Sequence, residues 1–321
     1  MRKDTGRLGK KAEKMAGKIV ILGVFVADTA YRAARQPRMG ETILGQSFVL
    51  GPGGKGSNQS VAAAQAGGDV HFITRLGADA FADMARDTWA RAGVTPEITL
   101  DPQSYTGAAY IFVEDGTGNN AIIIAPGAAA RISCDDVDAQ AALISGAAVF
   151  VTQLEQPMAA AHRALAIARR GGVRTILNPA PAAAISDEML ALCDIVTPNE
   201  TEAEGITGIA VTDLETARQA AAALLARGAG AAIVTLGENG ALYHDHTQTV
   251  HVAAFNAGAV VETTGAGDAF NGGLATALAE GMDPIAAVRF GCATAAISVT
   301  RPGTAPAMPS RAEIEALLAR G

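Results

Sequence analysis

TTGAGDAFNGG, residues 263–273, is a glycine-rich turn that opens directly into an alanine-rich helix. The first N–H groups of a helix have no partner within it, so together with the helix dipole they form an anion site. Asp268 stands in the predicted first turn, where a carboxylate can accept a proton from a nucleophilic hydroxyl. The segment therefore predicts phosphoryl transfer, with the N–H groups stabilising charge on the moving group. Taken alone, the same residues also fit a tight turn followed by a favourable N-terminal charge.

Strands and helices alternate along the rest of the chain. The run KIVILGV, residues 18–24, has no turn residue before Gly23 and is typical of a buried strand. Similar runs predict strands at 71–75, 148–152, 175–178, 195–197 and 232–235. Alanine-rich helices are predicted at 57–66, 80–92, 158–169, 214–226, 268–279, 284–299 and 311–320. This order predicts an α/β fold with a doubly wound, mainly parallel sheet and helices on both faces.

Two segments interrupt the alternation, because each reads as a pair of strands without a helix between them. They are residues 41–50 and 107–125, and the second contains the hairpin turn signals Asp115-Gly116 and Gly118-Asn119. An antiparallel outgrowth beside a parallel sheet predicts a small β-sheet lid, built from segments at about 40–51 and 106–126.

Charge is distributed unevenly. Residues 1–18 carry seven positive and two negative charges in a chain of net charge −7, so the remainder has a net charge of −12. We expect residues 1–17 to be a disordered basic tail and residues 18–321 to form one domain with its lid. A body this acidic is a poor nucleic-acid binder.

Targeting signals are missing from the sequence. No apolar run reaches the roughly 18 residues that span a bilayer, and the basic segment lacks the apolar core of a secretory signal. The three cysteines lie far apart, which is neither a disulfide framework nor a zinc-binding spacing. We therefore expect a cytoplasmic protein without nucleic-acid or membrane partners.

A second glycine-rich turn, GPGGKGSNQ at residues 51–59, also leads into a helix. Its glycines let the backbone approach a ligand closely, and Asn58 offers a donor and an acceptor to sugar hydroxyls. Lys55 is the only lysine beyond residue 18, which indicates a chemical requirement for an ammonium group. Chance placement of these residues is the alternative.

Carboxylates and amides follow several predicted strands. In TPNETEAE, residues 197–204, Asn199 and Glu202 are three apart and share one helix face. Their oxygens suit Mg²⁺, directly or through water, although the pattern is equally that of a capped helix with an acidic first turn. Asp28 and Glu155 each come just past a strand, where open α/β sheets bind ligands, and each would also fit a solvated loop.

Two other nucleotide-binding classes are disfavoured. The chain has no GxxxxGK[ST] motif of a Walker-A NTPase and no GxGxxG after its first strand, as a Rossmann dehydrogenase requires.

These motifs, in this order, resemble the ribokinase-like sugar kinases, the PfkB carbohydrate-kinase family. The resemblance runs from about residue 18 to residue 318 and rests on GGKGSNQ at 53–59, QLE at 153–155, NPAP at 178–181, TPNETEAE at 197–204 and TGAGD at 264–268. It implies a doubly wound domain with a β lid over the sugar, often a homodimer through that lid. It also implies transfer of the γ-phosphate of ATP to a primary sugar hydroxyl, with the 5-hydroxyl of D-ribose as the first expectation.

The resemblance assigns roles to individual residues. It makes Asp268 the catalytic base, with Gly265, Ala266 and Gly267 as the anion hole. The sugar is surrounded by Asp28, Gly54, Lys55, Asn58 and Glu155. Magnesium and phosphate are organised by Asn199 and Glu202, and the nucleotide is also contacted by Thr235, Gly237, Gly240 and Gly267. A monovalent cation, usually K⁺, is held by Glu262 and Thr264 with carbonyl groups of the stretch 299–308, namely those of Val299, Pro302, Thr304 and Met308.

Two positions depart from the family pattern. Val26 stands where the family's ribose kinases usually have Asn, and a valine cannot hydrogen-bond a ring hydroxyl. Glu262 stands where the family often has Asp, which alters the geometry around the cation. The alternatives are therefore a kinase for 2-deoxyribose, a ketohexose or a nucleoside, and, from another class, a non-catalytic sugar or nucleotide sensor.

Overall fold

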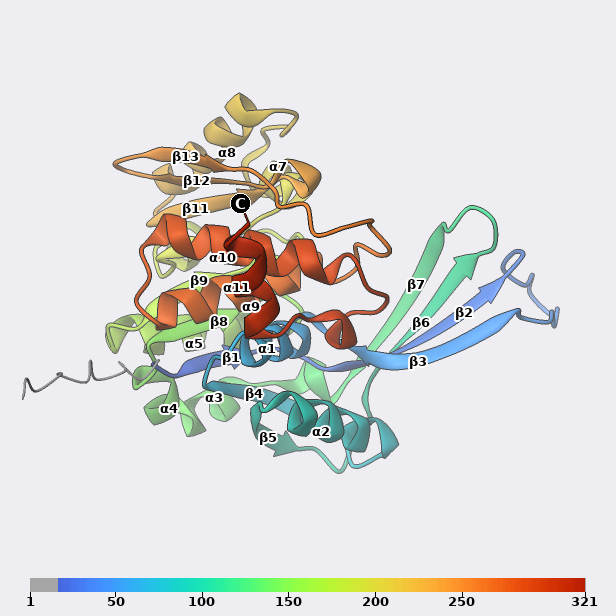
Figure 1. Ribbon diagram of the computed structural model, residues 1–321. Helices are drawn as coiled ribbons and strands as arrows, with labels where there is room; N and C mark the ends of the chain where they lie inside the picture. Colours follow the sequence, from blue (N-terminus) through green and yellow to red (C-terminus); the bar gives the residue numbers. More distant parts are fainter. Residues whose placement is uncertain (1–16, 321) are drawn as a thin grey trace, which may run out of the picture.

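Two β-sheets organise residues 17–320, which the computed structural model describes (Figure 1). The large sheet has nine strands in the order β13-β12-β11-β10-β9-β8-β1-β4-β5. Their bounds are β1 Ile19–Leu22, β4 Val70–Leu76, β5 Thr95–Leu100, β8 Val149–Thr152, β9 Arg174–Leu177, β10 Ile195–Val196, β11 Ala231–Thr235, β12 Ala241–Asp245 and β13 Thr249–Val252. All are parallel except β12 and β13, which extend one edge as an antiparallel pair.

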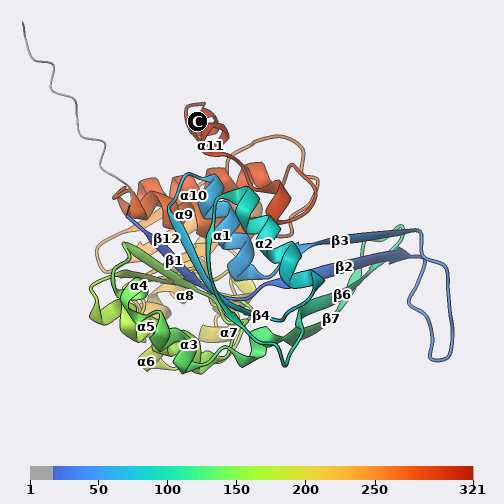
Figure 2. The same cartoon turned by 90° about the horizontal axis from the view of Figure 1, so that it is seen from below.

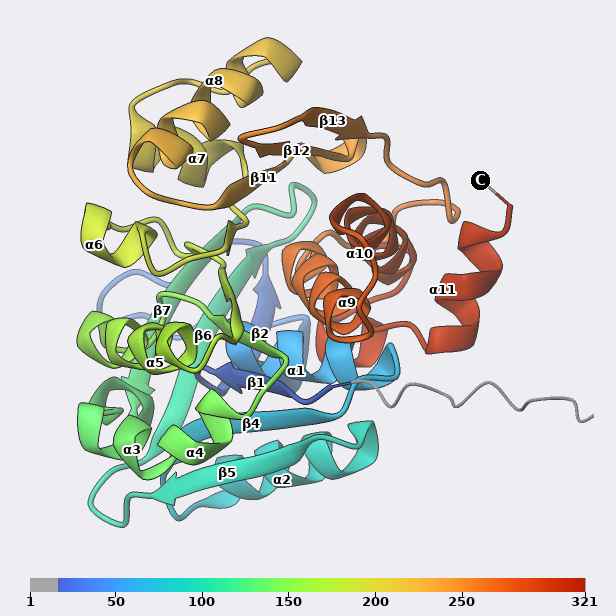
Figure 3. The same ribbon diagram turned by 90° about the vertical axis from the view of Figure 1, so that its left-hand side faces the viewer.

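Helices cover both faces of this sheet, as Figures 2 and 3 show from two directions. One face carries α1 Lys55–Gln65, α2 Ala80–Ala92, α9 Ala266–Ala279, α10 Pro284–Ser298 and α11 Arg311–Leu318. The other carries α3 Cys134–Ala139, α4 Ala141–Ser145, α5 Met158–Arg170, α6 Asp187–Leu190, α7 Glu200–Thr207 and α8 Leu214–Ala226. Side chains alternate along β1, so Ile19 and Ile21 enter the first core while Val20 and Leu22 enter the second. Burial on both faces explains why this strand is apolar throughout.

The predicted fold class is confirmed. Each strand predicted for the large sheet and each predicted helix is present among the described residues, and the helices at 80–92 and 214–226 match at both ends. The prediction missed β5, β12 and β13 and the short helices α3, α4 and α6. These elements lie at the sheet edge or last one to two turns, where periodicity is too short to read.

The small sheet is the lid, and one of its predicted strand pairs is wrong. Residues 41–50 do not pair with each other. Instead β3, Ser47–Gly53, pairs with β2, Val26–Ala33, in a four-stranded sheet of order β3-β2-β6-β7. Asp28 therefore lies within a lid strand opposite Gly51 rather than in a loop after the first strand. Strand β2 could not be recognised from the sequence, because the apolar run continues through residues 23–25, where the chain leaves β1 and bends into β2.

The second predicted pair is correct. Strands β6, Thr106–Glu114, and β7, Asn120–Gly127, form an antiparallel hairpin through the turn at 115–119. Together the four strands project from the body as a twisted flap (Figure 1).

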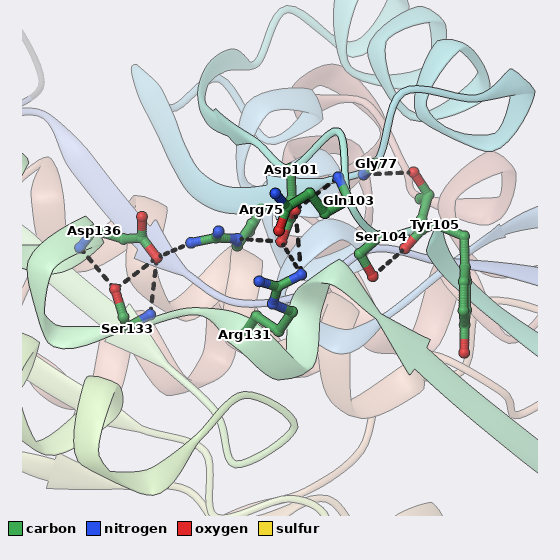
Figure 4. A network of polar contacts seen from close by, with 10 residues as sticks. Arg75, Gly77, Asp101, Gln103, Ser104, Tyr105, Arg131, Ser133 and Asp136 are labelled. Carbon is green, nitrogen blue, oxygen red and sulfur yellow. Dashed lines mark hydrogen bonds and ion pairs between the residues drawn. The ribbon is translucent and has the colours of Figure 1, made fainter.

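An ion network centred on the buried Asp101 links the two ends of this hairpin to the body (Figure 4). Asp101, only 3% exposed, accepts from Arg75 Nε at 3.1 Å and from Arg131 Nη1 at 3.1 Å. Arg75 also donates to Asp136 at 2.9 Å. Asp101 precedes β6 and Arg131 follows β7, so one buried carboxylate ties both ends of the hairpin to β4. Paired charges of this kind are costly to break, because removing one partner leaves the other buried without compensation.

Two sequence expectations concern the ends of the chain and the membrane. The predicted basic tail, residues 1–17, lies outside the described residues apart from Gly17. Between residues 17 and 320, the structure contains no helix whose length and hydropathy would let it cross a bilayer.

Candidate active site

A pocket of about 140 Å³ lies at the carboxyl ends of β9, β10 and β11, facing the first turn of α9. Open α/β sheets bind ligands at this edge, because the strand ends and helix N-termini converge there. Seven residues predicted from the sequence line this pocket: Lys55, Asn199, Glu202, Thr235, Gly265, Gly267 and Asp268. The lining is completed by four others: Asn178, Ala180, Thr197 and Asn271.

Helix α9 begins with a turn that leaves donors facing the pocket. Its N-cap Gly265 has φ 81°, a left-handed conformation that glycine adopts without strain. The N–H of Ala266 donates to Thr263 O at 3.1 Å, so this amide is not free for the anion hole predicted for it. In the described part of the chain the backbone N–H groups of Gly265 and Gly267 have no such acceptor, and they remain available to an anion.

Asp268 is buried at the third position of α9, only 6% exposed. Its Oδ1 accepts from Gln59 Nε2 at 3.0 Å, and its Oδ2 accepts from Asn58 Nδ2 at 3.1 Å. Burial raises the pKa of the carboxyl, while the charge of Lys55 and the two hydrogen bonds oppose that rise. Each carboxylate oxygen keeps one lone pair, so Asp268 is anchored and can still accept a proton.

Helix α1 brings Lys55 into the pocket because two glycines allow the helix to start against the end of β1. A Cβ on Gly56 would lie 2.6 Å from Gly23 Cα, a separation that no side chain tolerates. Lys55, the first residue of α1, donates its backbone N–H to Glu155 Oε2 at 2.7 Å. This contact joins the N-terminus of α1 to the loop that follows β8.

Two further carboxylates, Glu155 beside Lys55 and Asp28 in the lid strand β2, have shifted pKa values. Burial raises the pKa of Glu155 to about 7, opposed by the hydrogen bond and charge of Lys55 and reinforced by the charges of Asp268 and Asp28. Burial alone raises the pKa of Asp28 to about 6. Three carboxyl groups with raised pKa values, of which Glu155 feels the charges of both others and of Lys55, are typical of a functional site rather than of a folding core.

Asn199 and Glu202 form a capping box at the start of α7. Asn199 Oδ1 accepts from Glu202 N at 2.8 Å, and Glu202 Oε2 accepts from Asn199 N at 2.9 Å. The capped-helix interpretation of this motif is therefore confirmed, and the pair also lines the pocket. Its role in holding Mg²⁺ stays a prediction. Burial raises the pKa of Glu202, whose Oε1 is not used by the cap.

This donor set fits a magnesium ion that is shared with phosphate. Within residues 17–320 no three His, Cys, Asp or Glu side chains converge as a metal site. Mg²⁺ is commonly bound by one or two carboxylates, with water and substrate phosphates completing its shell. Glu202 and Asn199 match that requirement.

The remaining predicted residues lie around the pocket rather than in it. Gly237 and Gly240 bound the turn that follows the pocket residue Thr235, whose N–H donates to Pro198 O at 2.9 Å beside Asn199. Asn58 is 4% exposed, and its Oδ1 has no hydrogen-bond partner among the described residues. Gly54 is the N-cap of α1.

The predicted cation ligands come from two segments that lie side by side. Gly303 N donates to Glu262 Oε2 at 2.8 Å, and Thr304 packs against Gly265. The carbonyl of Val299 accepts from Val261 N at 2.8 Å and from Glu262 N at 3.2 Å, which brings the two segments together; its role as a cation ligand stays a prediction. Thr264 and Pro302 are exposed, and Met308 is buried.

Sequence reasoning assigned no role to Gln59, Asn178, Thr197 or Asn271. A usable signal existed for two of them, because Asn178 and Thr197 are polar residues that directly follow buried strands. Gln59 and Asn271 lie inside helices, where a polar residue usually faces solvent, and here both are buried.

Residues 16–311 of the chain match the pfkB family of carbohydrate kinases. A ribokinase of Haemophilus influenzae is 39% identical over 296 residues, which cover 92% of this chain and 96% of that protein. A deoxyribokinase of Salmonella typhi is 37% identical over 294 residues, covering 91% and 95%. The structure of a ribokinase of Arabidopsis thaliana, complexed with ribose and ATP, superposes with a TM-score of 0.89 at 30% identity and covers 95% of this chain and 99% of its own. Because the match extends over nearly the whole chain and the pocket carries the matching motifs, the protein belongs to the pfkB family of carbohydrate kinases.

Proposed function

We propose that this protein is an ATP-dependent ribokinase, which phosphorylates the 5-hydroxyl of D-ribose. One observation carries the proposal: Asp268, a buried carboxylate with free lone pairs, stands beside the unpaired amides of Gly265 and Gly267 in a pocket that Lys55 also enters. A general base beside an anion site is what in-line transfer of a phosphoryl group to an alcohol requires. Relatives named ribokinase, which share nearly the whole chain, support ribose as the acceptor.

In this mechanism Asp268 takes the proton of the 5-hydroxyl as the oxygen attacks the γ-phosphorus of ATP. The N–H groups of Gly265 and Gly267 stabilise the negative charge on the transferred group. Lys55 balances the carboxylates around it and lies close enough to the pocket to meet a phosphate oxygen. The closed lid would exclude water and so limit hydrolysis of ATP.

The sugar is proposed to lie between the lid base and α1. Asp28 and Glu155 would accept hydrogen bonds from its hydroxyls, and the backbone at Gly54 permits close approach. Asn58 supports this placement, because its buried Oδ1 lacks a partner and an unpaired buried acceptor is costly. A sugar hydroxyl would satisfy it.

The nucleotide is proposed to lie on the other side, with Asn199 and Glu202 holding Mg²⁺ directly or through water, and Thr235, Gly237 and Gly240 flanking ATP. Magnesium bound there would neutralise charge on the phosphates during transfer.

A monovalent cation, K⁺ first, is proposed beside this site, held by Glu262, Thr264 and carbonyls of Val299, Pro302, Thr304 and Met308. The free oxygen of Glu262 and the contact of Thr304 with Gly265 support it, because a cation there would brace the turn that carries the anion site. We expect kcat to be higher in KCl than in NaCl at equal ionic strength. In Glu262→Gln that difference should shrink, and a wild-type rate indifferent to the cation would contradict the proposal.

2-Deoxyribose is a second candidate acceptor, favoured by Val26. This side chain is 6% exposed and shares a face of β2 with Asp28, two residues on, yet it offers no hydrogen-bonding group. A site without that donor discriminates poorly for a ring hydroxyl. A relative named deoxyribokinase, 37% identical, agrees with this possibility.

Steady-state kinetics with MgATP over a sugar panel test the assignment. We expect D-ribose to have the highest kcat/KM, with 2-deoxyribose next and ketohexoses and nucleosides lower. Val26→Asn should raise the ratio of ribose to deoxyribose kcat/KM by about 3–10-fold, the value of one neutral hydrogen bond. Val26→Ala is the matched control and should leave the ratio unchanged. If a sugar other than ribose has the highest kcat/KM, that sugar replaces ribose as the proposed acceptor. If sugars bind but no ADP is released, the protein is a non-catalytic sensor rather than a kinase.

A homodimer formed through the lid is also proposed. Large apolar side chains are exposed there: Tyr31, Phe48, Val49, Leu50, Ile122, Ile123 and Ile124. An apolar patch of this kind on a sheet is typical of an interface. Sedimentation velocity measures the mass directly, and a monomer at micromolar concentration would contradict the dimer.

A further inference from the structure

Five buried side chains form a circuit of hydrogen bonds at the pocket wall, and all but Gln59 line the pocket. Gln59 Nε2 donates to Asp268 Oδ1 and to Asn178 Oδ1, both at 3.0 Å, and Asn178 Nδ2 donates to Thr197 O at 3.0 Å. Thr197 Oγ1 donates to Asn271 Oδ1 at 2.7 Å, and Asn271 Nδ2 donates to Gly267 O at 2.8 Å. The circuit starts and ends on α9 and passes through α1 and the ends of β9 and β10.

Backbone carbonyls set the direction of every bond in this circuit. The carbonyl of Thr197 only accepts, so the Asn178 amide must turn its Nδ2 toward it and its Oδ1 toward Gln59. Gln59 must then present Nε2 to Asn178, and the second hydrogen of the same nitrogen meets Asp268. The contact with Asp268 is therefore a donor contact by necessity.

Gln59 has no freedom to turn away. Its Oε1 accepts from Gln153 Nε2 at 2.7 Å, so three partners use both hydrogens and the carbonyl oxygen. The side chain is fully buried and does not line the pocket. It contacts no substrate, yet it touches one oxygen of the proposed base.

We propose that Gln59 is a positioning residue that fixes the carboxylate plane of Asp268. Without its hydrogen bond, only the single contact from Asn58 Nδ2 to Oδ2 would hold the carboxylate, and one contact leaves the carboxylate plane free to turn. This inference rests on the proposed role of Asp268 as the base. It adds that the ends of β9 and β10, on the nucleotide side, orient the group that activates the sugar.

Steady-state kinetics of Gln59→Met test the inference, because methionine keeps the shape and removes the donor. We expect kcat to fall by about 10–100-fold, since small misplacement of a reacting group costs rates of that size. The KM for the sugar should stay within a factor of about three, because Gln59 lies outside the pocket. Gln156→Met is the matched control: Gln156 is equally buried but bonds to Thr152 Oγ1 and Gln153 O, not to the circuit. It should keep kcat near the wild-type value.

Gln59→Glu distinguishes two roles of Gln59: donating a hydrogen bond to Asp268 and merely filling the space beside it. Glutamate has the same shape, so a purely steric role predicts a rate at least as high as that of Gln59→Met. If donation matters, Gln59→Glu should instead be slower than Gln59→Met, because a carboxylate has no hydrogen to donate to Asp268 and repels its charge. If neither variant folds, Gln153→Met decides, since it frees Gln59 from its third partner and should lower kcat more than Gln156→Met does.

Three outcomes would overturn the inference: a Gln59→Met rate close to wild type, equal losses in Gln59→Met and Gln156→Met, or a rise in KM at unchanged kcat. Failure of the proposed function is distinguishable, since the wild type would then phosphorylate no sugar in the panel. In that case the Asp268 side-chain torsion in crystals of Gln59→Met, compared with Gln156→Met, still decides whether Gln59 positions it.

Discussion

Asp268→Asn is expected to lower kcat by about 10²–10⁴-fold, the contribution of a positioned general base, while ATP affinity stays close to wild type. The amide cannot take the hydroxyl proton, and the phosphate-binding amides of Gly265 and Gly267 are untouched. The surrounding polar groups can adapt to the change. Asn58 can flip, because its Oδ1 is free to accept from the new Nδ2, while Gln59 continues to donate to Oδ1. Kinetics with saturating ribose measure the first effect, and titration calorimetry with MgATP measures the second.

The same substitution should not reduce thermal stability. Burial raises the pKa of Asp268, which means that the charged carboxylate pays a desolvation cost in the folded state. A neutral amide avoids this cost, so the unliganded variant should unfold at the wild-type temperature or above. Asp283→Asn is a suitable control, because Asp283 caps the N-terminus of α10 far from the pocket in sequence and does not line it. More than about a tenth of the wild-type rate in Asp268→Asn would exclude this residue as the base.

The parallel sheet was predictable because strands that are buried on both faces have continuous apolar sequences. The origin of the lid was not. Residues 19–27 are one uninterrupted apolar run except for Gly23, and nothing in it marks that β1 ends at Leu22 and β2 begins at Val26. The local pattern of apolar residues indicates only that this segment is buried. The bend at residues 23–25, which divides the run between two sheets, depends on the tertiary fold.

The active site was predictable where one local motif carries the chemistry. The turn before Asp268 and the glycines around Lys55 can be recognised from their residue spacing, and the structure brings both motifs to one pocket. The circuit through Gln59 was not predictable, because Gln59 and Asn178 are 119 residues apart. Their meeting depends on strand order and on the register of α1 against β1, and neither is encoded locally.

Lys55→Met is expected to lower kcat/KM by about 10²–10³-fold, the size of effect found when one group that stabilises transition-state charge is removed. The reason is the balance of charge around this ammonium. Its charge lowers the pKa of Glu155, Glu202 and Asp268 against the opposing effect of burial. Methionine fills similar space but leaves these carboxyl groups without that compensation, so their pKa values rise further.

The direction of the pH effect follows from the chemistry of a base. Asp268 acts as a base only when it is ionised, so kcat rises as the pH rises through the pKa of Asp268. This rise is the acid limb of the pH–rate profile, and a higher pKa moves it to higher pH. In Lys55→Met the acid limb of kcat should therefore shift upward by about one to three pH units, the effect of losing one nearby opposite charge. Lys55→Arg keeps the charge and should restore the limb to its wild-type position, even if the bulkier guanidinium lowers the rate. Because only charge distinguishes the two variants in this respect, a limb that stays in place in Lys55→Met, or moves equally in Lys55→Arg, would mean that the ammonium does not control the ionisation of the site.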